Sequence, residues 1–140
     1  MSMSESNIIY LEEKNFLNAK EKSEATLIVY SQFLLSYFNT LQKQDYSLCF
    51  RLKVLMYDMA VQLPISKSIR DSLRNYLLSN RPLNLISPLD ELVMRESVQF
   101  IYDKTCELFG PIKADSVMST AVRDTQQLPE AIIFHPRELL

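Results

Sequence analysis

The stretch that decides the fold is ATLIVYSQFLLSYFNTLQ, residues 25–42, which holds eighteen residues without a charge. A run of this length is close to the lower limit for a membrane-spanning helix. A spanning helix is mostly aliphatic, however, and polar side chains interrupt this run repeatedly. They are Ser31, Gln32, Ser36, Asn39, Thr40 and Gln42. We therefore expect a buried helix here and no membrane span.

Helical periodicity extends this run to a helix over about residues 20–43. Its apolar side chains cover an arc of roughly 220° on a helical wheel, about twice the width that a surface helix needs. We expect this helix to lie at the centre of the fold or to be shared with a partner. Its aromatic residues Tyr30, Tyr37 and Phe38 are predicted partner-binding anchors, because such side chains carry much of the binding energy of interfaces.

Six prolines divide the rest of the chain, because proline breaks the interior of a helix. Three further helices are predicted between them, over residues 46–62, 66–78 and about 87–109. Asp45, Ser66 and Ser87 precede these helices and are suitable N-caps. In the first of the three, the expected inward side chains are Leu48, Leu52, Leu55 and Met59.

The only glycine of the chain, Gly110, stands directly before Pro111. Glycine takes the left-handed conformation that ends many helices, and proline is favoured at the first position of the next helix. Apolar residues then follow at helical spacing from Ala114 to Leu128. We expect a tight corner between the fourth and fifth helices here, rather than a hinge or a ligand contact.

These elements predict an all-α fold, a single domain over residues 1–140 built as a bundle of about five helices. Residues 1–6 are expected to be a mobile tail. Two apolar runs lie outside the predicted helices, NIIYL at 7–11 and AIIFH at 131–135, and both are rich in strand-forming residues. We expect them to pair as a minor two-strand ribbon that joins the termini, or to pack irregularly over the bundle.

The composition excludes much catalytic chemistry. One glycine cannot build the glycine-rich loops that hold nucleotide phosphates. One histidine and two separated cysteines cannot supply the usual structural zinc sites or a di-iron helical bundle. His135 has no local nucleophile and no orienting partner, and a dyad with Cys49 or Cys106 is a weak alternative. We therefore expect no enzyme, no metal site and no cofactor.

One basic cluster stands out in the predicted helix 66–78. Lys67, Arg70 and Arg74 fall within about 60° of one another on a helical wheel, and Arg81 continues the line if the helix extends that far. With Asp71 as the only nearby acid, the local charge is +3 in a chain whose net charge is −2. A solvated helix face is the ordinary explanation. An acidic partner protein, nucleic acid and a membrane surface are the alternatives.

The function favoured by these features is a non-enzymatic protein–protein interaction module. It would act through apolar helix surface as an adaptor, chaperone or regulatory subunit, and it would form a homodimer. Two cysteines and a start without a secretory signal predict a reduced, cytoplasmic protein. The alternative is a nucleic-acid-binding transcriptional regulator that places helix 66–78 in a groove, although the acidic pI of about 5.4 argues against it.

Overall fold

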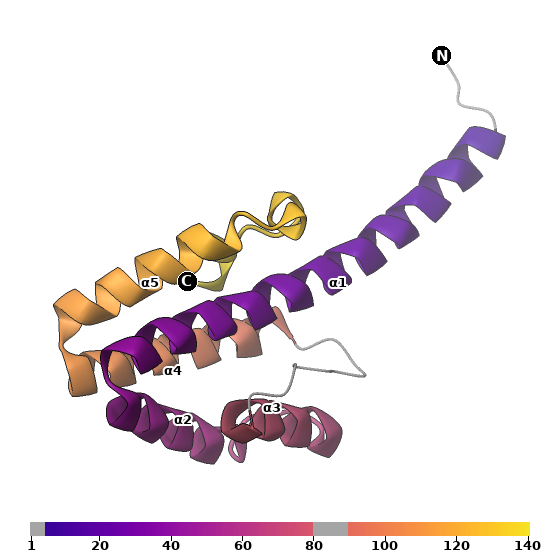
Figure 1. Cartoon of the computed structure of the whole chain (residues 1–140). Coiled ribbons are helices and arrows are strands. Elements are labelled where there is room, and N and C mark those ends of the chain that lie inside the picture. Colours follow the sequence, from indigo (N-terminus) through magenta and orange to yellow (C-terminus); the bar gives the residue numbers. More distant parts are fainter. Residues whose placement is uncertain (1–4, 80–89) are drawn as a thin grey trace.

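The computed structural model describes the backbone of residues 5–79 and 90–140, with the side chains of residues 19–78 and 90–140. This part of the chain forms five α-helices and ends in two short 3-10 helices. They are α1 (Glu5–Gln44), α2 (Tyr46–Ala60), α3 (Lys67–Ser79), α4 (Glu91–Phe109), α5 (Pro111–Thr125), η1 (Pro129–Ile132) and η2 (Pro136–Leu139). No strand occurs among these residues, so the predicted all-α bundle of about five helices is confirmed (Figure 1).

The predicted ribbon between residues 7–11 and 131–135 is wrong. Residues 7–11 lie inside α1, where helical hydrogen bonds satisfy their backbone. Residues 131–135 hold the end of η1 and the turn that leads to Pro136. A short apolar run fits a strand or a buried helix equally well by periodicity alone. Of the predicted tail, residues 1–4 lie outside the described residues, and residues 5 and 6 belong to α1.

Helix α1 is the central element, with α2 and α5 packed against its carboxyl-terminal half (Figure 1). It is longer than predicted, and in Figure 1 its amino end extends past the other helices. The charge-free run is buried, as expected, and supplies eight of the 28 buried apolar residues of the described chain. Its fully buried apolar residues are Val29, Tyr30, Phe33, Leu34, Tyr37 and Leu41. Ile28 and Leu35 are exposed, so the buried arc is narrower than the apolar arc of the sequence.

Helix α2 begins where the sequence predicts, because Asp45 Oδ1 accepts a hydrogen bond from Leu48 N at 3.0 Å. Its buried stripe is turned from the expected one and consists of Cys49, Leu52, Met56 and Ala60. Of the four predicted inward residues only Leu52 is fully buried, and Leu55 is 37% exposed. The error has a simple cause. Apolar residues occur all round this helix, so the pattern does not identify the face that packs inward.

Helices α3 and α4 each begin after a short polar side chain that accepts a hydrogen bond from the first turn. Ser66 Oγ accepts from Ile69 N at 3.3 Å, which confirms the predicted start of α3. Helix α4 begins at Glu91 with Asp90 as its N-cap, since Asp90 Oδ1 accepts from Leu92 N at 2.7 Å. The predicted cap Ser87 lies outside the described residues.

Gly110 forms the predicted corner, since it is at once the C-cap of α4 and the residue before Pro111, the first residue of α5. Its N–H donates to Cys106 O at 3.0 Å, and its carbonyl accepts from Ala114 N at 3.1 Å. Its dihedral angles are φ 92° and ψ 157°, so its positive φ is confirmed, but the left-handed helical conformation is not. The extended ψ lets α5 turn back along α4 without a linker.

Within residues 5–79 and 90–140, none of the helices has both the length and the hydropathy of a membrane span.

Candidate functional site

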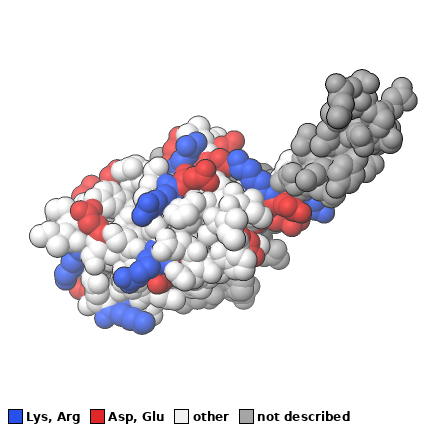
Figure 2. Space-filling view, turned by 90° about the horizontal axis from the view of Figure 1, so that it is seen from above, with Lys and Arg blue, Asp and Glu red and all other residues white. Residues whose placement is uncertain are grey.

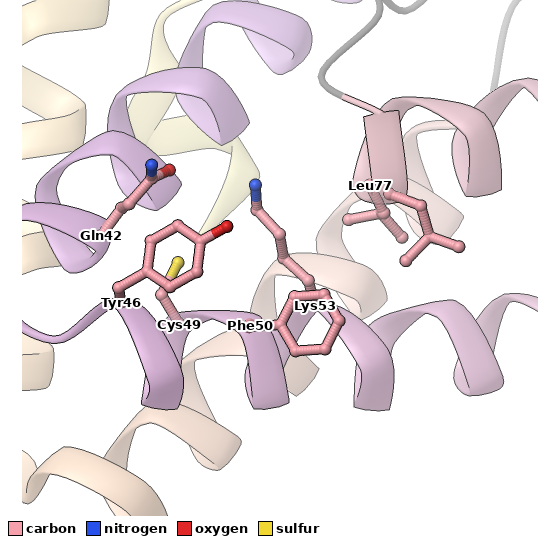
Figure 3. Close-up of a pocket in the computed structure, with 7 residues that line it drawn as sticks. Gln42, Tyr46, Cys49, Phe50, Lys53 and Leu77 are labelled. Atoms are coloured by element: carbon pink, nitrogen blue, oxygen red, sulfur yellow. The ribbon is translucent and has the colours of Figure 1, made fainter.

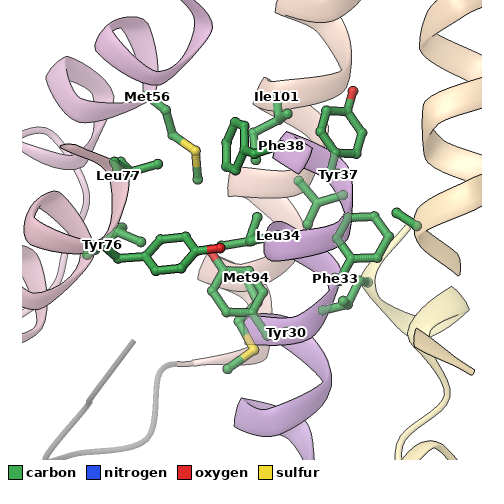
Figure 4. Close-up of a cluster of buried hydrophobic side chains, with 14 of the residues drawn as sticks. Tyr30, Phe33, Leu34, Tyr37, Phe38, Met56, Tyr76, Leu77, Met94 and Ile101 are labelled. Atoms are coloured by element: carbon green, nitrogen blue, oxygen red, sulfur yellow. The ribbon is translucent and has the colours of Figure 1, made fainter. Parts of the chain in front are cut away.

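The predicted aromatic anchors do not lie on the surface. Tyr30 and Tyr37 are 0% exposed and Phe38 is 3% exposed, and all three project into the core (Figure 4). The Tyr30 hydroxyl hydrogen bonds Ser97 Oγ at 2.7 Å. This burial corrects the expectation that these residues contact a partner. The same aromatic pattern fits a core as well as an interface, because both are dry and closely packed.

The predicted basic cluster on α3 is only partly open to solvent. Lys67 is exposed, whereas Arg70 and Arg74 are half-buried against their own fold. The Arg74 Cζ atom lies 3.6 Å from the centroid of the Tyr57 ring on α2, and Arg70 Nη2 donates to Ile65 O at 3.4 Å. Arg74 therefore packs α3 against α2, and Arg70 bonds the segment that connects the two helices. Arg81 lies outside the described residues.

A second apolar stripe runs along the outer side of α2. We call it the α2 outer face and define it as Tyr46, Phe50, Val54, Tyr57 and Val61. Tyr46 is 66% exposed and Phe50 is 52% exposed, and Val54 and Val61 are exposed as well. Tyr57 is half-buried beneath Arg74. A row of large apolar side chains in water is unusual on a helix whose other side already forms part of the core.

A small pocket opens beside the α2 outer face, between α2, α3 and the end of α1 (Figure 3). Its volume is about 80 Å³, which is well below the size of pockets that enclose a substrate or cofactor. The Lys53 side chain rises from α2 between Tyr46 and Leu77, and its ammonium lies 5.4 Å from the Phe38 ring centroid. Gln42, Cys49 and Phe50 also line the pocket, as does the exposed Leu78.

The thiol in this pocket is not suited to nucleophilic chemistry. Burial raises the pKa of Cys49, and the nearby Lys53 ammonium only partly opposes that shift. Its Sγ lies 3.5 Å from Phe38 O, to which it donates. A thiol held protonated in this way is a poor nucleophile, because the thiolate is the reactive form.

The single histidine serves as a helix cap. His135 Nδ1 accepts a hydrogen bond from Arg137 N at 3.1 Å, at the start of η2. Its Nδ1 lone pair is therefore occupied by the backbone. Within the described residues, no group of three or more His, Cys, Asp or Glu side chains could hold a metal ion.

Charge is distributed unevenly along the chain. Residues 46–79, which span α2 and α3, contain five Lys or Arg and two Asp or Glu, so they carry +3 and leave −5 on the remainder of a chain of net charge −2. Arg51, Lys67, Arg70 and Arg74 form no ion pair with any other described residue. On the side of the molecule seen from above in Figure 2, by contrast, the described acidic and basic side chains are interspersed.

Comparison with protein-family models, with curated proteins and with solved structures gave no match for this sequence. No residue role can therefore be transferred from a related protein.

The α2 outer face is the feature that the sequence analysis missed, although its signal is present. Its members follow one another at steps of four, four, three and four residues, which is the spacing of a helix–helix seam. The same helix carries a second regular stripe, which consists of Cys49, Leu52, Met56 and Ala60. Only the structure shows which of the two packs against α1 and α4.

Proposed function

We propose that this chain is a non-enzymatic protein-binding module that docks a partner protein on the α2 outer face. The observation that carries the proposal is the exposure of Tyr46 and Phe50 in line with Val54 and Val61 on a helix that already buries its opposite side. Such a module would serve as an adaptor, a chaperone or a regulatory subunit.

The energetics of the α2 outer face favour association. Burying a large apolar side chain completely is worth about 1.5–3 kcal/mol. Tyr46 and Phe50 both lie near one end of α2 and are 66% and 52% exposed, so a partner that covers both gains roughly one such contribution. Tyrosine is also among the residues most often found at the energetic centres of interfaces.

The chemistry of the described residues supports a binding role over a catalytic one. Of the three candidates for nucleophilic or acid–base catalysis, Cys49 is buried and His135 caps η2, and Cys106 is a half-buried free thiol. The pocket beside α2 is too small to enclose a substrate, and the larger pocket of about 360 Å³ beside Arg123 and Arg137 is lined by none of these three residues.

Nucleic acid is less well supported as the partner. Arg70 and Arg74, which would contact a groove or its phosphates, instead contact Ile65 and Tyr57. Of the three described residues of the predicted basic row, only Lys67 is exposed.

The experiment is an affinity capture from native lysate with three forms of the chain, followed by mass spectrometry. The unchanged chain is compared with Phe50→Asp and with Ile112→Asp, which places the same charge on an 86% exposed isoleucine of α5. We expect a defined set of proteins to be recovered by the unchanged chain and by Ile112→Asp, and to be lost with Phe50→Asp. Recovery of the same set by all three forms would refute the proposal.

A further inference from the structure

We propose that the chain binds a small amphiphilic anion, with a carboxylate or phosphate head on an apolar chain, in the hollow between α5 and η2. We call this hollow the α5–η2 hollow. It is separate from the α2 outer face and does not depend on the proposed function. Three features support this ligand: two arginines that line one hollow, an apolar wall that continues from it, and the positions of the charges along α5.

Two arginines from different elements line the α5–η2 hollow, whose volume is about 360 Å³. Arg123 belongs to the last turn of α5, and Arg137 lies in η2, which packs against α4 and α5 near the end marked C (Figure 1). Neither guanidinium forms a hydrogen bond or an ion pair with another described residue. The described residues that line the hollow include no acid. This arrangement favours an anion, because each guanidinium presents a fork of donors that fits a carboxylate or a phosphate.

The wall of the α5–η2 hollow continues as apolar surface toward α4. Met118 and Leu140 line both this hollow and a second one of about 250 Å³, so the two hollows adjoin. Val98 and Tyr102 of α4 line the second hollow. Volumes of a few hundred Å³ are typical of sites for small organic ligands. Met118 is half-buried, and its unbranched side chain can adapt to an apolar chain that lies along this surface.

The charges along α5 give the site a direction. Asp115 lines the second hollow and precedes Arg123 by eight residues, so the two lie about 12 Å apart along the helix. The Asp115 carboxylate accepts a hydrogen bond from the Tyr102 hydroxyl. An anionic head is repelled at Asp115 and attracted at Arg123 and Arg137. The ligand therefore places its head at the arginines and its apolar chain toward Tyr102.

The surroundings favour a free ligand over a membrane surface. The chain has a net charge of −2, so it is not attracted as a whole to anionic lipid. Within η2, Glu138 directly follows Arg137. The two arginines therefore do not belong to a wider basic patch of the kind that binds anionic membranes.

The test is isothermal titration calorimetry of the unchanged chain with octanoate and with octyl phosphate, below the concentrations at which they form micelles. Two control ligands separate the parts of the amphiphile, since 1-octanol has the same chain without the charge and acetate has the charge without the chain. We expect saturable binding of at least one of the two anions, and binding about tenfold weaker or less for both controls. Equal affinity for 1-octanol and the anions, or no saturable binding of either anion, would overturn the proposal.

Three variants then assign the binding to the arginines. Arg123→Gln and Arg137→Gln each remove one guanidinium, and Lys113→Gln removes a charge from an exposed residue of α5 that lines neither hollow. We expect each arginine variant to weaken binding about tenfold, and Lys113→Gln to change it by less than about twofold. Both arginine side chains are exposed, and the cap of η2 uses the backbone N–H of Arg137, so the fold should persist, which circular dichroism checks. Equal losses in the three variants would remove the arginines from the site.

The remaining measurements identify the place and the source of the ligand. Phe50→Asp should bind octanoate as the unchanged chain does. Loss of binding in Phe50→Asp but not in the arginine variants would place the anion on the α2 outer face, and the proposal would fail while the proposed function stands. Sedimentation with vesicles of phosphatidylcholine and phosphatidylglycerol, without binding of either free anion, would assign the arginines to a membrane surface instead. Loss of captured lysate proteins with Arg123→Gln, again without binding of either free anion, would assign the hollow to a protein partner and overturn the proposal equally.

Discussion

The hydroxyl of Tyr37 on α1 lies 2.6 Å from Thr105 Oγ1 on α4, and Thr105 in turn donates its proton to Ile101 O at 2.6 Å. A hydroxyl has a single proton, so Thr105 is the acceptor and Tyr37 the donor. Tyr30 and Ser97 repeat the arrangement, because Ser97 donates to Met94 O at 2.7 Å. Tyr37 follows Tyr30 in α1, and its partner Thr105 likewise follows Ser97 in α4. The two helices therefore run in the same direction, and these two hydrogen bonds fix their register.

We predict that Tyr37→Phe lowers the free energy of unfolding by about 1 kcal/mol, because a buried hydrogen bond is lost. Tyr30→Phe should have an effect of similar size. Thr105 and Ser97 keep their bonds to backbone carbonyls, so neither replacement leaves them without a partner. Urea unfolding followed by circular dichroism measures the loss. Tyr46→Phe, at an exposed ring, is the matched control and should change stability by less than about 0.5 kcal/mol.

The buried tyrosines should cause the fold to lose stability at alkaline pH. Burial raises the pKa of Tyr30 to about 12, well above the ordinary value of 10.0, and it raises the pKa values of Tyr37 and Tyr76 as well. The unfolded chain releases these protons at lower pH than the folded chain does. The contribution of Tyr30 is therefore complete below pH 10 and is lost as the pH rises from about 10 to about 12.

Urea unfolding at a series of alkaline pH values measures this loss, with the difference between the unchanged chain and Tyr30→Phe isolating one phenol. We expect the decline above pH 10 to be shallower in Tyr30→Phe. Tyrosinate absorbance of the folded chain provides a second measure, since the buried phenols should ionise only as the chain unfolds. If the free energy of unfolding fell equally steeply above pH 10 in the unchanged chain and in Tyr30→Phe, the loss could not be assigned to the Tyr30 phenol.

The sequence predicts the helices far better than it predicts their outward faces. Capping chemistry is local, so Asp45, Ser66 and Gly110 could be placed from a few neighbouring residues. The choice of buried face is not local. Helix α2 carries apolar residues on both sides, and only its contacts with α1, α3 and α4 decide that Leu52 is buried while Phe50 is exposed. For the same reason, aromatic residues of α1 were predicted at an interface and belong to the core.

Leu52 and Phe50 therefore give opposite responses to truncation, although they are two positions apart. Leu52 is 0% exposed, so Leu52→Ala should cost about 2–5 kcal/mol through lost burial and the cavity that remains. Phe50 is more than half exposed, so Phe50→Ala should change the free energy of unfolding by less than about 0.5 kcal/mol. Thermal or urea unfolding of the two variants checks the assignment. A large loss in Phe50→Ala would mean that its ring supports the fold rather than a partner site.

Substitution of Gly110 should lower the stability of the fold only through the backbone conformation at this residue. A Cβ atom added there meets nothing within 4 Å, so no steric contact with the rest of the fold opposes a side chain. Its φ of 92° combined with ψ 157° is instead a backbone conformation that residues other than glycine rarely adopt. We expect Gly110→Ala to cost about 1–3 kcal/mol, and Gly110→Val at least as much, because the strain arises in the backbone of the corner. Ile112→Ala, at an exposed position in the same corner, should be nearly neutral in the same urea titration. If Gly110→Ala were also neutral, α4 and α5 could not be joined by the backbone conformation described for this residue.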